Sequence, residues 1–388
     1  MDKSICEKYV SCSSHLLKSL VQINTCQPEG NENAIIEYIM ACFPQGTDMV
    51  KIQHTSERSS LVVRIHGYKE TGGLAFIGHV DTVATGDPSL WTNPPLEAYE
   101  ENGVIYGRGT ADMKGGVAAM TCAALSLIES GEKPDSTMYF CYTADEEKNG
   151  IGIRSIIESG LINGVSQVII AEPSEDTISS CEKGALWIHI DAKGVQAHAS
   201  RPEVGLNAIQ ALIDFKKLFL DKLDTHTIHP LLGSTTAEIT KLNGGIMTNI
   251  IPEYAGMEMD IRAIPGHSNE HILKIAEEVK AILCGRYPKL KLELKVLNDR
   301  PSVEVESNAS LVSNMKSVFK ELGVKAPSKG TYFYTDMSQI APSLKVPFII
   351  LGPGDDKKAH CIDECIKISS LFLITKIYIR YIEKYCMG

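Results

Sequence analysis

The sequence predicts an α/β protein whose larger domain contains a mixed, mostly parallel sheet, interrupted by an inserted ferredoxin-like α+β domain. Strand-like and helix-like segments alternate between about residues 50 and 175, which is typical of a parallel sheet. Near Lys183 the order changes to β-α-β-β-α-β, the order of a ferredoxin-like sandwich. A chain of 388 residues is also expected to form more than one domain.

Hydrophobic periodicity assigns the elements of the larger domain. Its first part is predicted to contain helices 5–22 and 32–43, strand 74–77, a helix from 117 to about 130, and strands 137–143 and 167–170. Its second part is predicted to contain helix 308–322, strand 346–351 and helix 367–384. Ligands gather at the carboxyl edge of such sheets, so polar residues just after the strands are candidate site residues.

The inserted domain is predicted from a different pattern. Leu186, Ile188 and Ile190 alternate with polar residues, as in a strand with one exposed face. The elements that follow are predicted as helix 205–222, strands 235–242 and 255–263, helix 268–284 and strand 289–296. We therefore predict that 1–182 and 298–388 form the larger domain, with 183–297 inserted between them.

Composition and charge limit the partners that we expect. The chain is 44% hydrophobic and 22% charged, with a net charge of -10, whereas nucleic-acid binders usually carry a basic face. Its start lacks the pattern of a secretory leader, and its apolar runs are too short for a membrane span. The eleven cysteines form no Cys-x-x-Cys pair, which favours a reducing compartment. We expect a cytoplasmic protein with no nucleic-acid or membrane partner.

Five short segments, four of them directly after predicted strands, hold acids and histidines suited to a metal site. They are Gly78-His79-Val80-Asp81, Gly109-Thr110-Ala111-Asp112-Met113-Lys114-Gly115, Asp145-Glu146-Glu147, Ala171-Glu172-Pro173, and Gly352-Pro353-Gly354 running on to Ala359-His360. Histidine and carboxylate donors without thiolate suit Zn²⁺, with Co²⁺ or Mn²⁺ as substitutes. A metal-dependent enzyme is therefore the leading interpretation.

The spacing of these residues suggests how they divide the work. On a strand His79 and Asp81 point the same way, so His79 can bind a metal while Asp81 accepts its other N–H. Asp112, in a glycine-dense loop, can bridge two cations about 3.5–4 Å apart; a phosphate-binding loop would need a Gly-Lys-Ser/Thr ending. Of Glu146 and Glu147, one can bind metal while the other takes a proton from water. A solvated strand end and an exposed acidic turn remain the alternatives for the first and third segments.

In order and spacing, the five segments resemble a family of di-zinc amidohydrolases and metallopeptidases. This family contains acetylornithine deacetylase, succinyl-diaminopimelate desuccinylase, carboxypeptidase-type enzymes and aminoacylases. The likeness covers nearly the whole chain and is greatest to the acetylornithine deacetylase branch. It implies two Zn²⁺ per subunit and hydrolysis of the amide bond of an N-acyl amino acid. A dipeptidase or carboxypeptidase acting on a short peptide is the alternative, and a non-catalytic metal-binding scaffold is a remote one.

The resemblance also implies a role for each residue of the larger domain's site. Glu146 would act as general base and then proton donor, and Asp81 would orient His79. The metal ligands would be Asp112 between the two ions, His79 and Glu172 on one ion, and Glu147 and His360 on the other.

In the inserted domain the resemblance implies contacts with the substrate and with a second subunit. His198 would polarise the scissile carbonyl, reaching across from the partner subunit of a homodimer formed through this lid domain. Asn249 and Arg262 correspond to substrate-binding positions, with pairing of Arg262 to Asp260 as the alternative. In the second part of the larger domain, Gly330 and Thr331 are candidate substrate-binding residues that can offer backbone and hydroxyl donors. The segment from Lys329 to Ser338 departs from the family pattern, and its Tyr332, Tyr334 and Asp336 are candidates to bind a substrate amine.

Overall fold

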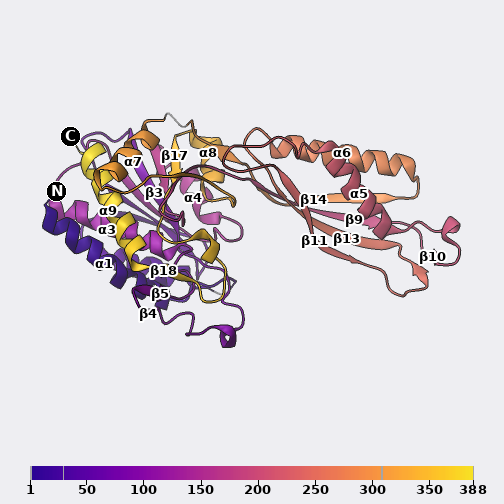
Figure 1. The fold of residues 1–388 in the computed structure, drawn as a ribbon, viewed down its shortest axis with the longest axis horizontal. Coiled ribbons are helices and arrows are strands. Elements are labelled where there is room, and N and C mark those ends of the chain that lie inside the picture. The colour runs from indigo at the N-terminus through magenta and orange to yellow at the C-terminus, as the bar shows by residue number, and fades with distance from the viewer. Residues whose placement is uncertain (1, 29, 307–308, 388) are drawn as a thin grey trace. The chain divides into compact units, whose positions relative to one another are not determined.

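The computed structural model describes residues 2–28, 30–306 and 309–387, which form two compact units (Figure 1). Unit 1 comprises Met1–Ser180, Val305–Lys329 and Thr335–Gly388, and unit 2 comprises Cys181–Glu304 and Gly330–Tyr334. Unit 1 is thus built from segments far apart in the sequence. Within the described part of the chain, no helix has both the length and the apolar character needed to cross a bilayer.

Unit 1 is organised around a mixed sheet. The strands are β1 (Asp48–Gln53), β2 (Ser59–Ile65), β3 (Gly73–His79), β6 (Met138–Thr143), β7 (Val165–Ile170), β8 (Ile178–Glu182) and β17 (Phe348–Ile350). Their order is β1-β2-β6-β3-β7-β17-β8, and the four central strands β6, β3, β7 and β17 run parallel. This arrangement confirms the predicted α/β class. A small antiparallel sheet of β4 (Tyr99–Glu101), β5 (Val104–Tyr106) and β18 (Cys365–Lys367) lies apart from it.

Seven helices of unit 1 fall within the described residues. They are α1 (Lys3–Gln22), α2 (Glu32–Cys42), α3 (Lys114–Ser130), α4 (Ile151–Glu158), α7 (Ser310–Glu321), α8 (Met337–Leu344) and α9 (Ile368–Tyr385). Helices α1, α3 and α9 pack against one another (Figure 1), and α9 reaches the sheet where Tyr378 meets Phe76 edge-on with ring centres 4.9 Å apart. The first residue predicted for α7, Asn308, lies outside the described residues.

Small residues let α3 lie directly against the end of β7. A β-carbon on Gly116 would stand 1.9 Å from the carbonyl oxygen of Ala171, so only glycine permits this approach. Glu172 follows at once, and Asp112 lies just before the helix. The close approach therefore places two candidate ligands near each other.

Unit 2 has the predicted β-α-β-β-α-β order. Its elements are β9 (Ala185–Lys193), α5 (Ala208–Lys222), β11 (Thr236–Gly244), β13 (Tyr254–Arg262), α6 (Asn269–Arg286) and β14 (Lys291–Arg300). The strands form an antiparallel sheet in the order β11-β13-β9-β14, and the buried alternate residues of β9 pack with α5 and α6. Short strands β10 (Ala197–His198) and β12 (Ile250–Ile251) pair separately, while β15 (Val303–Glu304) pairs with β8; β16 (Ser328–Thr331) also borders β8.

Candidate metal centre

Four predicted ligands lie at or after the ends of the parallel strands β3, β6, β7 and β17, and the loop before α3 adds Asp112 to them in unit 1. The Nε2 atom of His79, the last residue of β3, lies 3.1 Å from Oδ1 of Asp112 and 3.4 Å from Oε1 of Glu172. The Nε2 atom of His360 lies 3.2 Å from Oδ2 of Asp112 and 3.0 Å from Oε1 of Glu147. Asp112 therefore stands between two histidine–glutamate pairs, with one carboxylate oxygen directed to each histidine.

The loop that carries Asp112 is held by a residue from near the other end of the chain. Oε1 of the buried Glu364 accepts hydrogen bonds from the backbone N–H groups of Ala111, at 2.9 Å, and Asp112, at 3.0 Å. Its other carboxylate oxygen accepts a 2.6 Å hydrogen bond from Nη1 of Arg108, which is also buried. Glu364 was not among the predicted site residues, although it lies only four residues after His360.

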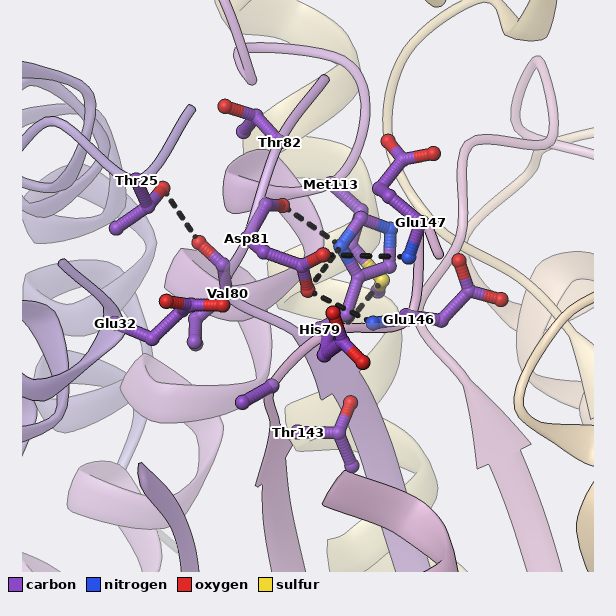
Figure 2. A network of polar contacts seen from close by, with 12 residues as sticks. Thr25, Glu32, His79, Val80, Asp81, Thr82, Met113, Thr143, Glu146 and Glu147 are labelled. Carbon is purple, nitrogen blue, oxygen red and sulfur yellow. Dashed lines mark hydrogen bonds and ion pairs between the residues drawn. The ribbon is translucent and has the colours of Figure 1, made fainter. Parts of the chain in front are cut away.

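Asp81 links His79 to the turn that contains Glu146 and Glu147 (Figure 2). Its carboxylate accepts the backbone N–H of Glu146 at 3.1 Å and that of Glu147 at 3.2 Å. Figure 2 shows the carboxylates of both glutamates pointing away from Asp81. Asp81 thus fixes the backbone of the turn, while the carboxylates of Glu146 and Glu147 point away from Asp81 and are not held by it.

The contact between His79 and Asp81 differs from the predicted one. The Nδ1 atom of His79 lies 2.9 Å from the backbone carbonyl oxygen of Asp81 and 3.7 Å from its carboxylate. A carbonyl can only accept, so in the neutral imidazole Nδ1 carries the proton and Nε2, which faces Asp112 and Glu172, is the nitrogen that can bind a metal. The carboxylate was expected to make this contact because residues two apart share a face of a strand. However, β3 ends at His79, so Asp81 lies beyond the strand and the alternation of a strand no longer sets the direction of its side chain.

Buried negative charge dominates the electrostatics of the site. Burial, together with the charge of Asp112, raises the pKa of Glu172 to about 8, and burial likewise raises the pKa of Glu146 and Glu147. Hydrogen bonds to Asp112 and Glu147 raise the pKa of His360 to about 10. The carboxylates also lie close together, so each disfavours the ionised form of its neighbours, and the two histidines offset part of this negative charge.

The side chains present fit divalent cations. Groups close enough to share one ion include His79 with Asp112 and Glu147, and His79 with Glu146 and Glu172. Oε2 of Glu172 is buried and has no hydrogen-bond partner among the described residues, which would be costly unless a cation met it. A third acidic group, Glu175 with Asp355 and Asp356, differs because Lys329 and Lys357 already pair with it.

The predicted substrate-binding residues His198, Asn249, Arg262, Gly330 and Thr331 all belong to unit 2. His198 and Asn249 are exposed, while Gly330 and Thr331 are buried. Arg262 makes a two-pronged ion pair with Asp260, at 2.9 and 3.0 Å, the alternative left open by the sequence.

Asp336, a predicted contact for a substrate amine, is buried in unit 1. It accepts a 2.7 Å hydrogen bond from Oγ1 of Thr143, the last residue of β6. This burial does not favour direct contact with a substrate.

Comparison with known proteins identifies the family. A model of peptidase family M20/M25/M40 matches residues 75–384. The chain belongs to this family. The M20 chain is 29% identical over 402 residues to a probable succinyl-diaminopimelate desuccinylase of Staphylococcus aureus strain MSSA476, covering 95% of this chain and 94% of the relative. It is 30% identical over 379 residues to the succinyl-diaminopimelate desuccinylase of Rickettsia bellii strain OSU 85-389, covering 94% and 95%.

Solved structures share the fold of this M20 chain at lower identity. Aminopeptidase PepT from Bacillus cereus ATCC 10987 has a TM-score of 0.79 at 20% identity, covering 96% of this chain and 98% of that one. The M20 metallo-carboxypeptidase Sso-CP2 from Sulfolobus solfataricus has a TM-score of 0.79 at 17% identity, covering 99% of both chains. The YXEP protein of Bacillus subtilis, described as a dinuclear metal-binding M20 peptidase, has a TM-score of 0.68 at 15% identity, covering 98% of both. The predicted family and the predicted class of enzyme, a hydrolase acting on amide bonds, are confirmed.

Proposed function

We propose that this M20 hydrolase cleaves the amide bond of an N-acyl amino acid with the help of two divalent cations, Zn²⁺ in the native enzyme and Co²⁺ or Mn²⁺ as substitutes. The arrangement of Asp112 between two histidine–glutamate pairs carries the proposal. Asp112 would touch both ions, His79 and Glu172 would hold one, and Glu147 and His360 the other. The description of the YXEP protein as dinuclear supports this count.

Glu146 is the proposed general base. Bound cations would acidify a water molecule and polarise the substrate carbonyl. Glu146 shares the ligand cluster with His79 and Glu172, so its carboxylate can take the proton of an attacking water. It then gives that proton to the leaving amine. Asp81 keeps the acid in place through the Glu146 N–H.

His198 is proposed to donate a hydrogen bond to the scissile carbonyl. Its Nδ1 accepts the backbone N–H of Ser200 at 3.1 Å, so in the neutral ring the proton is on Nε2. An exposed Nε2–H is the donor that a developing oxyanion needs. Asn249, Arg262, Gly330 and Thr331 stay proposed substrate contacts.

The N-acyl amino acid is favoured over a peptide by one observation. Relatives at 29% and 30% identity are named desuccinylases, whereas the structures named as peptidases stand at 20% and 17%. A dipeptidase or carboxypeptidase is therefore the second candidate. For the N-acyl amino acid, we propose either an acetyl or a succinyl group as the acyl group. We also propose a role in amino-acid biosynthesis.

Hydrolysis of a small substrate panel tests the proposal. Zinc-reconstituted protein is offered N-acetylornithine, N-succinyl-diaminopimelate and several dipeptides, each with and without a chelator. Chelator-sensitive release of acetate or succinate is expected. Cleavage of dipeptides alone would move the chain to the second candidate, and activity that survives complete metal removal would overturn the metal-dependent mechanism.

We also propose a homodimer formed through unit 2 and a location in the cytoplasm. The homodimer is supported by exposed apolar side chains on and beside strands β11 and β13, namely Leu242, Ile246, Met247 and Tyr254. The eleven free cysteines support a reducing compartment. A monomer in sedimentation at micromolar concentration would contradict the dimer and with it a cross-subunit role for His198.

A further inference from the structure

Arg58 is the centre of a partly buried polar network that includes Asp145 and Gln27 and that reaches Asp81, beside the turn that carries the proposed base. We propose that Arg58 is a positioning residue that fixes Glu146 and Glu147 through two routes, one by way of Asp145 and one by way of Gln27 and Asp81. The inference rests on the proposed function, because it gives Arg58 a purpose only if these glutamates act together at a metal centre.

The direct route is an ion pair at the start of the turn. Nη1 of Arg58 pairs with Oδ1 of Asp145, whose side chain is only 2% exposed, and the arginine side chain is itself 16% exposed. Asp145 precedes Glu146 and has a φ of 61°, in the left-handed region, which aspartate adopts more readily than most residues. Arg58 therefore anchors the residue at which the turn toward Glu146 and Glu147 begins.

The indirect route passes through an amide whose orientation is determined by its partners. Nη2 of Arg58 donates to Oε1 of Gln27, and Nε2 of Gln27 donates at 3.2 Å to the carboxylate of Asp81 and at 3.2 Å to that of Glu32. Asp81 in turn accepts the N–H groups of Glu146 and Glu147, the end of the route seen in Figure 2. The guanidinium of Arg58 thus reaches both glutamates through two side chains, those of Gln27 and Asp81, and two backbone N–H groups.

Charge explains why an arginine stands here. Nε of Arg58 lies 3.5 Å from Oε1 of the fully buried Glu32, so the network holds three acids, Glu32, Asp81 and Asp145, around one cation. Removing that cation would leave buried carboxylates uncompensated, and they would draw apart or admit water. A shift of about 1 Å in a catalytic group can lower a rate by about 100-fold.

Arg64 provides a matched control because it makes the same kind of pair nearby. It lies in strand β2, which begins one residue after Arg58, and Nη2 pairs with Asp48 at 2.9 Å. Both side chains of that pair are 29% exposed, and neither belongs to the site. Loss of Arg64 removes an arginine–aspartate pair without touching the turn.

The test compares Arg58→Met, Arg58→Lys and Arg64→Met in the metal-loaded protein. We expect Arg58→Met to bind two equivalents of Co²⁺ with an altered visible absorption spectrum, because Glu147 is displaced, and to lose about 100-fold in kcat with little change in KM. Arg58→Lys should recover at least part of the spectrum and of kcat, since it restores the cation. Arg64→Met should match the wild type in its Co²⁺ absorption spectrum and in kcat, even if its melting temperature is lower.

A wild-type spectrum and kcat in folded Arg58→Met would overturn the inference, as would an equal loss in Arg64→Met. If Arg58→Met does not fold, Gln27→Met decides, because it cuts the indirect route and keeps every charge; it should alter the same spectrum. Failure of the proposed function is distinguishable. A wild type that binds Co²⁺ but hydrolyses none of the substrates refutes the substrate class, while the spectra still decide the role of Arg58.

Discussion

At the scale of single residues, Glu146 and Glu147 are adjacent acids with different environments. Glu147 lies 3.0 Å from His360, whereas Glu146 is held by its backbone to Asp81 and is the proposed base. We expect Glu146→Gln to keep its two metal ions and to lower kcat by about 10³-fold or more. Glu147→Gln should instead lose metal. Metal analysis beside steady-state kinetics separates the two outcomes, and near-normal turnover in Glu146→Gln would refute the assignment.

Glu364 is expected to control the position of Asp112. The variant Glu364→Gln keeps the shape of the side chain but leaves the buried Arg108 without its charge partner, a change that costs about 3–5 kcal/mol in comparable pairs. We predict a lower free energy of unfolding in urea and weaker metal binding. A variant with wild-type metal affinity would show that the Asp112 loop holds its shape without Glu364.

The sequence predicted the residues that stand in recognisable metal-ligand motifs. It did not predict the residues that support them, which are identified only by their contacts in the fold. His79 and Glu147 lie at or just after strand ends, and Asp112 lies in a glycine-dense loop, so the sequence predicted that they meet. Glu364 and Arg58 act across long stretches of chain on backbone groups or on other side chains, and neither shows a pattern of its own. Which oxygen of Asp81 accepts the hydrogen bond from Nδ1 of His79 depends on the residue at which β3 ends. Hydrophobic periodicity locates the end of a strand only to within one or two residues.

At the scale of elements, the close contact between α3 and Ala171 leads us to predict the effect of a substitution at Gly116. A β-carbon on Gly116 would meet the Ala171 carbonyl at 1.9 Å, so Gly116→Ala must push the helix away from the Glu172 segment. We expect lower stability and reduced metal content. Gly285→Ala in α6 is the control, because nothing lies within 4 Å of its added carbon and alanine favours a helix by about 0.5–1 kcal/mol. Equal behaviour of the two variants in thermal unfolding would contradict this account.

The ion pairs that join α7 to α9 give a prediction about pH. Hydrogen bonds from Arg380 and Lys384 lower the pKa of Glu321 to about 2, from 4.5. A lowered pKa in the folded state means that the pairs stabilise the protein above pH 4.5 and lose this effect as the pH falls toward 2. Glu321→Gln should therefore lower the melting temperature at pH 7 by more than at pH 3.5. A constant difference across that range would exclude the pairs as its cause.

Most elements were predictable because their burial follows a simple period. The fully buried β3 and β6 come from continuous apolar runs, and β9 comes from strict alternation. The short helices α4 and α8 were not assigned, because eight residues offer little more than two turns of pattern and α8 contains Pro342.

At the scale of the whole molecule, the two units have separate cores, so metal removal should affect them differently. The five candidate ligands belong to unit 1, and an ion that binds only the folded state stabilises it by about 2.7 kcal/mol at one hundred times its Kd. We predict two calorimetric transitions, of which a chelator lowers only one. His360→Ala should lower the same transition and abolish its response to chelator. A chelator effect on both transitions would mean that the units do not unfold separately.

The division into units was harder to foresee than the fold class. The change from parallel to alternating pattern near Lys183 predicted a first boundary between 182 and 183, whereas the units divide between Ser180 and Cys181. Gly330–Tyr334 was placed with the larger domain, yet it belongs to unit 2. A segment of five residues is too short to change the composition or the hydrophobic periodicity of the sequence. Its assignment to unit 2 therefore comes only from its contacts in the structure.

Because unit 1 is discontinuous, the order of synthesis constrains how its centre can form. His79, Asp112, Glu147 and Glu172 emerge from the ribosome before Cys181–Glu304, but His360 and Glu364 emerge after it. A nascent chain therefore carries four clustered acids and histidines, with the last ligand and the support of the Asp112 loop still to be translated. A pause in translation before residue 360 would prolong this half-built state, in which an ion can be bound by an incomplete set of ligands.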